Sequence, residues 1–274
     1  MIEFQNASYS HSKGNGVNNL NLRIDEGEFV FMIGPTGSGK TTLMRLIYFD
    51  LIPDAGIVIV GEYSSSNMTT RKIPIARKGV GMVFQDYKLL NDRNLFENTA
   101  LPLHALGFPA KDIIDRVDEA LDLVGLESKV EHLPLELSGG EQQRIFIARA
   151  LAQQGDTLLL DEPTANLDLQ HQTIIFDQVK SLAKKGVTIL AAINDLNIAA
   201  RYCDRLILMR NGSLLKDGKP EEVLTSRNIQ KAFDVETAVY IDPVNHQLTI
   251  HPIAHITENA QIIENGKRIW SKTA

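Results

Sequence analysis

The sequence predicts an α/β fold built on a parallel sheet, and three observations lead to this prediction. Short apolar runs alternate with segments of helical period up to about Pro220. Several of these runs are apolar at successive positions rather than at every second one, which indicates strands buried on both faces. The chain has 274 residues, of which 43% are hydrophobic and 23% charged, so it is long and apolar enough to bury such a core.

Six short, mostly apolar runs are the predicted strands. They span residues Phe29–Ile33, 57–60, 80–84, 157–160, 187–192 and 206–209. The best-defined helix covers residues 111–124, because its apolar residues fall at i, i+4, i+7, i+8 and i+11 and share one face. These residues are Ile113, Val117, Ala120, Leu121 and Val124, and acidic residues occupy the opposite face.

Two further segments differ from the α/β pattern. Residues from about 86 to 151 are mostly of helical period, which predicts a helical subdomain inserted into the core. Beyond about Pro220 the pattern weakens, and Pro243 and Pro252 interrupt it. We therefore expect one domain over residues 1–224 and a small C-terminal appendix over residues 225–274.

Composition excludes several classes of protein. Lys and Arg total 28 against 34 Asp and Glu, a net charge of −6, which argues against nucleic acid as the main partner. A single cysteine, Cys203, excludes a disulfide framework and a Cys-rich zinc site, and favours a reducing compartment. The N-terminus has no signal-peptide pattern, and the longest apolar runs fall far short of the roughly 20 residues that a membrane span needs. The chain is therefore not expected to cross a membrane by itself.

Eight consecutive residues fit the pattern of a phosphate-binding P-loop, between an apolar run and a predicted helix start. They are Gly34, Pro35, Thr36, Gly37, Ser38, Gly39, Lys40 and Thr41. Glycines let backbone N–H groups surround phosphate oxygens, and the helix N-terminus adds a favourable dipole. In this pattern Lys40 reaches the β- and γ-phosphates of a nucleotide and Thr41 holds Mg²⁺.

A second motif is the apolar run 157–160 followed by two adjacent carboxylates. Pro163 then prevents the strand from continuing. In a P-loop enzyme the first carboxylate, Asp161, would hold Mg²⁺ through water. The second, Glu162, would act as the general base on the attacking water.

The third motif covers residues 137–144. Ser138 and Glu141, three residues apart, form a capping box that predicts a helix start, and Gly139 and Gly140 allow a close approach by an anion. With the two motifs above, the chain resembles the ATP-binding subunits of ABC transporters. The resemblance implies a P-loop NTPase core of the ABC ATPase type, with the inserted helical subdomain and the C-terminal appendix.

The resemblance also implies a function. It implies hydrolysis of ATP with Mg²⁺ by a head-to-tail homodimer, in which Ser138, Gly139 and Gly140 of one copy contact the nucleotide held by the other. It implies an integral membrane permease-type partner, and hence a peripheral place at the cytoplasmic face of the inner or plasma membrane. Gln85 matches the glutamine loop that senses Mg²⁺ and faces this partner. Residues 166–168 match the loop that links the two nucleotide sites across the dimer.

Three further positions are assigned by the same resemblance. Thr42 extends the nucleotide-binding loop by one residue. The aromatic residue that stacks on adenine is expected near Tyr9 or His11, and spacing favours His11. Asn194 stands where the family has its switch histidine. An amide can still bond a phosphate oxygen but cannot carry a proton, so we expect nucleotide binding and dimer closure to survive better than hydrolysis.

The two halves of the chain resemble different branches of the family. Residues up to about Arg149 are similar to the cell-division ATPases of the FtsE type, through segments 47–50, 71–74 and 83–90. Residues from about Asp161 onward are similar to the ATPases of iron-chelate and cobalamin importers, through segments 167–172 and 194–202. Because the membrane partner docks on the first half, an FtsX-like partner is favoured over an importer permease.

Two other functions compete with a transport or mechanical motor. One is an ATP-gated scaffold, in which Asn194 makes hydrolysis too slow to cycle. The other is an ABC ATPase of DNA repair or translation. One P-loop and a separation of 53 residues between Gln85 and Ser138 argue against this last class, because repair types carry long insertions there and translation types carry two ATPase domains.

Overall fold

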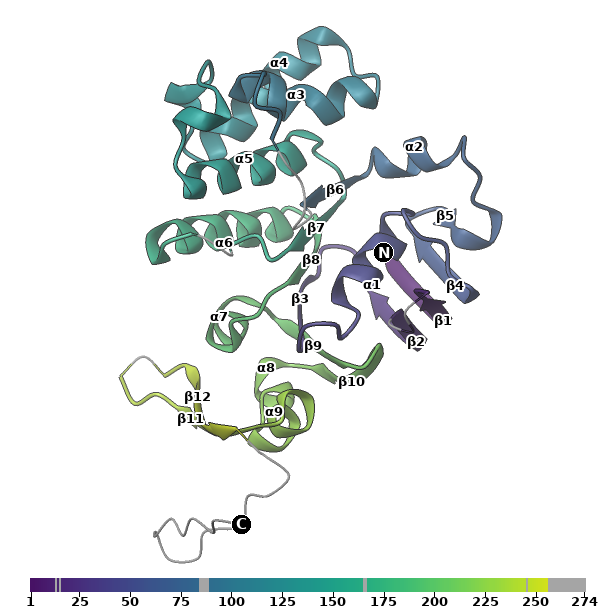
Figure 1. The fold of residues 1–274 in the computed structure, drawn as a ribbon, viewed down its shortest axis with the longest axis vertical. Coiled ribbons are helices and arrows are strands. Elements are labelled where there is room, and N and C mark those ends of the chain that lie inside the picture. Colours follow the sequence, from purple (N-terminus) through teal and green to yellow (C-terminus); the bar gives the residue numbers. More distant parts are fainter. Residues whose placement is uncertain (13, 15, 84–88, 165–166, 245, 256–274) are drawn as a thin grey trace, which may run out of the picture.

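The computed structural model describes residues 1–12, 14, 16–83, 89–164, 167–244 and 246–255 (Figure 1). Its helices are α1 Lys40–Ile47, α2 Ile73–Arg77, α3 Leu95–Ala105, α4 Ala110–Leu123, α5 Gly139–Ala152, α6 Leu169–Lys184, α7 Leu196–Tyr202, α8 Pro220–Val223 and α9 Ser226–Phe233. Its strands are β1 Ile2–Ser10, β2 Gly16–Ile24, β3 Phe29–Ile33, β4 Ala55–Val60, β5 Tyr63–Ser64, β6 Val80–Val83, β7 Thr157–Asp161, β8 Thr188–Ala192, β9 Arg205–Arg210, β10 Ser213–Gly218, β11 Val235–Ile241 and β12 Leu248–His255.

A six-stranded sheet forms the centre of the molecule, in the order β10-β9-β3-β8-β7-β6. The pairings of β9, β3, β8, β7 and β6 are parallel, and β10 is an antiparallel edge strand. Every residue of β3, β7 and β8 is buried. The α/β prediction is therefore confirmed. All six predicted strands are present, and five of them belong to this sheet, apart from small shifts at their ends and Phe84, which lies outside the described residues.

Residues 57–60 form a strand, but the prediction that this strand is buried on both faces was wrong. This run belongs to β4, which lies in a second, antiparallel sheet of order β2-β1-β4-β5. Only Val58 and Val60 are buried, whereas Ile57 and Ile59 are half-buried. One face of this sheet packs on the core and the other is more open, so alternate residues of β4 are buried.

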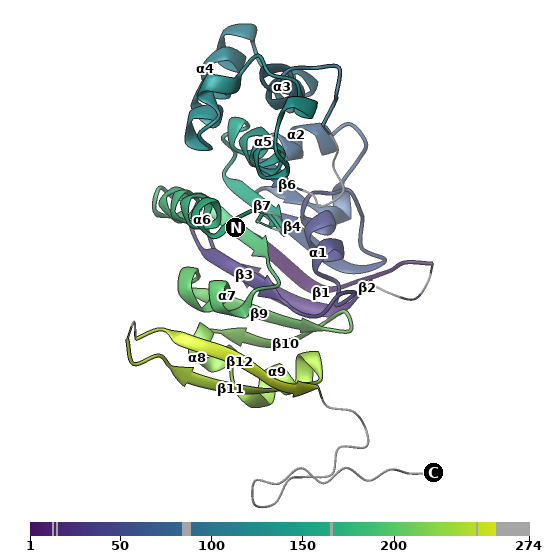
Figure 2. The same ribbon diagram turned by 60° about the vertical axis from the view of Figure 1, so that its left-hand side comes forward.

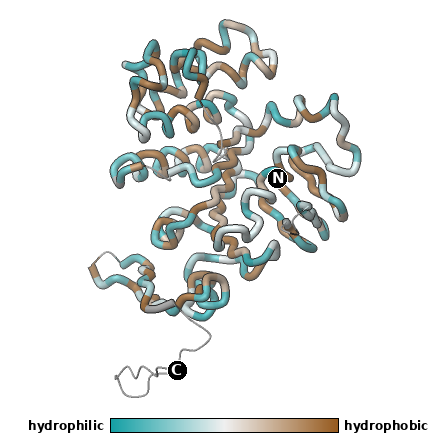
Figure 3. The backbone as a smooth tube through the Cα atoms, in the orientation of Figure 1, coloured by the Kyte–Doolittle hydropathy of each residue, from teal (hydrophilic) through white to brown (hydrophobic). Residues whose placement is uncertain are grey.

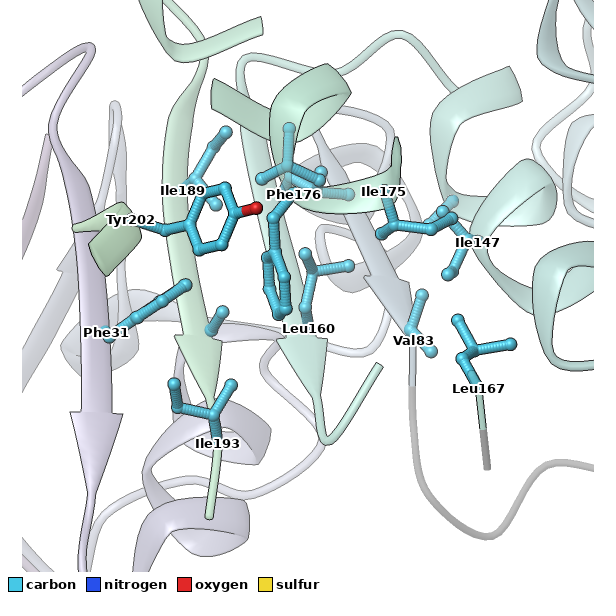
Figure 4. Packing of buried hydrophobic residues seen from close by; sticks show 14 of the residues in the cluster. Phe31, Val83, Ile147, Leu160, Leu167, Ile175, Phe176, Ile189, Ile193 and Tyr202 are labelled. Atoms are coloured by element: carbon cyan, nitrogen blue, oxygen red, sulfur yellow. The ribbon is translucent and has the colours of Figure 1, made fainter. Parts of the chain in front are cut away.

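Two hydrophobic cores lie on opposite faces of the six-stranded sheet. Side chains alternate across a strand, so Phe29 and Phe31 of β3 belong to the core beneath α6 and α7. Val30 and Met32 belong to the other core, which α1 and the antiparallel sheet complete. Figure 4 shows the first core, in which the Phe176 ring contacts those of Phe31 and Tyr202 at centroid separations of 5.4 Å and 5.2 Å.

Helices α3, α4 and α5 group together at one end of the molecule (Figures 1 and 2). α4 covers Ala110–Leu123, and its buried residues include the predicted Ile113, Val117, Ala120 and Leu121. Val124 is the C-cap residue and is also buried. The predicted helix at 111–124 is thus confirmed to within one residue at each end.

Strands β11 and β12 lie at the opposite end from α3–α5 (Figure 2). There β11 and β12 form an antiparallel hairpin against α9. The segment is more regular than its weak pattern suggested. Figure 3 shows the hydrophobic residues concentrated along the central strands. None of the helices in the described ranges is long and apolar enough to span a bilayer.

Candidate functional site

The P-loop connects the carboxyl end of β3 to the N-terminus of α1, as its sequence predicted. Two of its glycines are required by the backbone. Gly39 caps α1 with a φ of 102°, a left-handed conformation that favours glycine. A Cβ atom on Gly34 would lie 2.4 Å from the carbonyl oxygen of Met209, so only glycine lets the loop cross β9 this closely.

A cavity of about 280 Å³ opens beside this loop. It is lined by Gly16, Thr36, Gly37, Ser38, Gly39, Lys40, Thr41, Thr42, Glu162 and Asn194. Residues from two predicted motifs and one further predicted position therefore meet at one place: the P-loop, Glu162 of the acidic pair and Asn194 after β8. All of them follow the carboxyl ends of parallel strands except Gly16, which begins β2.

Lys40 and Ser38 make the cavity suited to a polyanion. The Nζ of Lys40 is buried and donates to the carbonyl oxygens of Gly34 (2.6 Å) and Pro35 (3.3 Å). Burial lowers the pKa of Lys40, and the negative charges of Glu162 and Asp161 oppose this shift. The hydroxyl of Ser38 is also buried and has no hydrogen-bond partner among the described residues. A buried cation, an unsatisfied hydroxyl and a helix N-terminus together fit phosphate oxygens.

Thr41 and Asp161 supply two oxygen atoms beside the cavity. The hydroxyl of Thr41 donates to Oδ2 of Asp161 at 2.8 Å, which joins the start of α1 to the end of β7. Asp161 is only 2% exposed. A hydroxyl and a carboxylate are oxygen donors of the kind that Mg²⁺ prefers, so this pair fits the predicted cation site.

Glu162 and Asn194, which both line the cavity, contact each other. The side-chain amide of Asn194 donates to Oε1 of Glu162 at 2.7 Å. The backbone of Glu162 is left-handed, with a φ of 51°, and its N–H donates to the carbonyl oxygen of Ala192. The turn after β7 thus places the carboxylate of Glu162 beside the residues that follow β8.

Tyr9 and His11, the alternatives for adenine stacking, lie next to each other near α1. Their rings meet edge to face at a centroid distance of 4.9 Å. His11 Nε2 lies 3.1 Å from the hydroxyl of Thr42, which places His11 beside the P-loop helix. Neither ring lines the cavity itself, and the stacking role stays a prediction.

The predicted capping box at residues 138–141 is present at the N-terminus of α5. Ser138 N–H donates to Glu141 Oε2 at 2.9 Å, and Glu141 N–H donates to the Ser138 hydroxyl at 3.3 Å. Lys129 also donates to Glu141, and this bond, with those from Ser138, lowers the pKa of Glu141 to about 2. Ser138 and Gly139 are exposed, and Ser138, Gly139 and Gly140 are not among the residues that line the P-loop cavity.

Three predicted residues remain to be placed, and two residues at these sites were not predicted. Gln85 and Asn166 lie outside the described residues, whereas Asp168 caps α6 by accepting from His171 N–H. Sequence reasoning missed Gly16 at the cavity and Lys129 at Glu141. No spacing rule connects either residue to its partner, so no signal in the sequence would have found them.

Comparisons with known proteins agree with this geometry. The family model described as ABC transporter matches residues 17–165. The cell division ATP-binding protein FtsE of Mycobacterium tuberculosis is 40% identical over 210 residues, which are 76% of this chain and 91% of the relative. The methionine import ATP-binding protein MetN 2 of Bacillus cereus is 33% identical over 267 residues, 96% of this chain and 78% of the relative.

A solved structure with a similar fold is the bacterial ABC transporter cassette MJ0796, described as dimeric. It aligns with a TM-score of 0.74 and 32% identity, covering 80% of this chain and 99% of the cassette. The same cassette is also known in a dimeric post-hydrolysis state bound to ADP and Pi, with the same alignment values.

Replacing Lys40 tests the phosphate site. We expect Lys40→Ala to weaken binding of Mg-ATP by about 100-fold or more, because it removes a buried cation that faces the phosphates. Isothermal titration calorimetry measures the affinity. Lys184→Ala, which removes an exposed lysine at the end of α6, is the control and should bind like the native protein. Unchanged affinity in a folded Lys40→Ala protein would refute the assignment of the P-loop.

Proposed function

Because this chain belongs to the ABC transporter family and is one of its ATP-hydrolysing subunits, we propose that it works as a head-to-tail dimer. In this proposal the dimer closes on ATP and drives a separate membrane subunit. One observation carries it: none of the residues of the family's signature motif, Ser138, Gly139 and Gly140, lines the P-loop cavity, and Ser138 and Gly139 are exposed elsewhere on the chain. A second copy, turned head to tail, would bring its signature to this cavity.

The N-terminus of α5 is suited to such a contact. The first N–H groups of a helix lack intrahelical partners, and the helix dipole favours an anion there. Glu141, in the first turn, would repel a phosphate group, but Lys129 pairs with its carboxylate. The solved cassette MJ0796 is described as dimeric, which supports a dimer of this chain.

The cavity residues divide the work of hydrolysis. Lys40 and the N-terminus of α1 stabilise the negative charge of the phosphates, which increases in the transition state. Glu162 is the general base that takes a proton from the attacking water. Thr41 and Asp161 would hold Mg²⁺, together with Gln85, and a bound Mg²⁺ would neutralise phosphate charge.

The membrane partner follows from the likeness to relatives. We propose an FtsX-like partner, since the FtsE relative is 40% identical over nearly its whole length. The alternative is an importer permease, and the match to MetN 2 favours it because that match covers 96% of this chain, whereas the FtsE match covers 76%. The resemblance to iron-chelate and cobalamin importers stays a prediction. In either case the chain would lie peripherally at the cytoplasmic face of the membrane.

Replacing the general base tests hydrolysis and dimer closure together. We expect Glu162→Gln to reduce phosphate release from Mg-ATP by about 100-fold or more, since that is a typical contribution of a general base. The ATP-bound dimer should then accumulate, which multi-angle light scattering detects as a doubled mass. Glu236→Gln, on the exposed part of β11, is the control.

Each outcome has a distinct meaning. A Glu162→Gln protein that stays monomeric with ATP would count against the dimer. If the native protein releases phosphate well above a reaction without protein, undiminished release by Glu162→Gln would remove Glu162 as the base. Native release no faster than the reaction without protein would favour the ATP-gated scaffold, which Asn194 in place of a histidine suggests.

Site-specific crosslinking identifies the membrane partner. Leu90, 38% exposed just before α3, is a suitable site for a new thiol. The native Cys203 does not interfere, because burial raises the pKa of its thiol to about 12. We expect Leu90→Cys, labelled with a photocrosslinker in native membranes, to capture an FtsX-type protein by mass spectrometry. Ser226→Cys, at the start of α9, should capture no membrane subunit, and capture of an importer permease at Leu90→Cys would overturn the FtsE-like assignment.

A further inference from the structure

We propose that Gln143 of α5 is a positioning residue that holds the turn carrying Glu162. Its side-chain Nε2 donates to the carbonyl oxygen of Pro163 at 3.1 Å, and Pro163 directly follows Glu162. The inference rests on the proposed role of Glu162 as the general base. It adds to the reaction a residue that is not among those lining the P-loop cavity.

The chemistry of this contact determines its direction. A carbonyl oxygen only accepts, so the group of Gln143 that faces it is the NH₂ of the amide. Pro163 is buried and has no backbone N–H, so its carbonyl oxygen is the one backbone group through which it can form a hydrogen bond. A buried carbonyl oxygen without a partner is destabilising. Gln143 therefore satisfies a group that the turn needs to have satisfied.

The turn after β7 has a strained backbone at the base itself. Glu162 has a φ of 51°, a left-handed conformation that a glutamate rarely adopts and that persists only where its surroundings hold it. Its N–H donates to the carbonyl oxygen of Ala192 at 2.9 Å. Beyond Pro163, the side-chain Nε2 of Gln172 in α6 donates to the carbonyl oxygen of Thr164 at 3.3 Å. Glutamine side chains from α5 and α6 thus hold the turn from two helices.

α5 is the more rigid side of this contact. Its N-terminus is fixed by the capping box, and Gln142 donates to the carbonyl oxygens of Pro134 (2.9 Å) and Leu137 (3.3 Å) just before it. Ile145 and Ile147 of α5 are buried in the core that Figure 4 shows. A packed helix of 14 residues has less freedom than a turn, so the bond places the turn on the helix and not the helix on the turn.

The position of the turn matters for the chemical step. A general base must lie within hydrogen-bond distance of the water it activates. A shift of the turn moves the carboxylate of Glu162 with it, and a misplacement of about 1 Å can lower a rate by about 100-fold. Because Gln143 does not line the cavity, its loss should lower the rate of hydrolysis and leave the affinity for ATP unchanged.

Kinetics of Gln143 variants test the proposal. We expect Gln143→Leu, which is similar in size but has no donor, to lower kcat by about 10-fold or more and to keep ATP affinity within about twofold of native. Gln143→Asn, polar but one methylene too short to reach, should lose activity too. Gln143→Lys, whose ammonium group can donate to the same carbonyl oxygen, should retain more activity than either. Gln178→Leu, at a half-buried position of α6, is the control. A native kcat in folded Gln143→Leu and Gln143→Asn proteins, or a tenfold loss of ATP affinity, would overturn the proposal.

Mixed dimers show whether Gln143 serves the base or the signature. When Lys40→Ala and Ser138→Arg proteins are mixed, the complete site takes its P-loop and Glu162 from the Ser138→Arg copy and its signature from the Lys40→Ala copy. Adding Gln143→Leu to the Ser138→Arg copy should lower the activity of the mixture by about 10-fold or more, and adding it to the Lys40→Ala copy should leave that activity within about twofold.

The opposite dependence, or an equal loss from either copy, would show that Gln143 does not act on the base and would overturn the proposal. Failure of the proposed function is distinct. In that case the mixture would be inactive without any change at Gln143, or Glu162→Gln alone would keep the native rate.

Discussion

The parallel pairing of β3, β8 and β7 is the constraint on which the rest of the structure depends. Met32 of β3 and Asp161 of β7 both lie opposite Ala192 of β8, so the three strands end at the same edge of the sheet. Backbone bonds continue this alignment beyond the strands, from Ile193 N–H to Met32 and from Glu162 N–H to Ala192. The P-loop, the acidic pair and Asn194 are neighbours because of this register, although they are far apart in the sequence.

The two cores hold this edge of the sheet from both faces. Glycines, in turn, let α5 pack closely on β6. Phe31 and Met32 of the same strand pack into opposite cores, so the strand that leads into the P-loop is held from both faces. Around α3–α5 the chain enters and leaves by way of β6 and β7. There a Cβ atom on Gly155 would lie 2.4 Å from the carbonyl oxygen of Gly79, and one on Gly81 would lie 2.5 Å from that of Ala150. The end of α5 and the segment between α5 and β7 can pack this closely on the start of β6 only because Gly81 and Gly155 are glycines.

The sequence predicts the centre of the fold better than its borders, for physical reasons. β3, β7 and β8 are buried on both faces, so their apolar runs stand out without any knowledge of their neighbours. β1 and β2 were missed because bulges interrupt their alternation of buried and exposed residues, as the positive φ values of Asn6 and Asn19 show. The P-loop and the capping box at Ser138 are local patterns and were found. The Asn194–Glu162 bond depends on the order and register of strands, which sequence spacing does not contain.

The central claim is that each active site takes its P-loop from one copy and its signature from the other. The direct measurement is ATP hydrolysis by mixtures of two variants, Lys40→Ala with a defective P-loop and Ser138→Arg with a blocked signature. Each variant alone should be inactive, and an equal mixture should recover up to about a quarter of native activity, because half of the dimers are mixed and each mixed dimer has one intact site. A mixture no more active than its components, with both proteins folded and Ser138→Arg still binding ATP, would contradict the head-to-tail account.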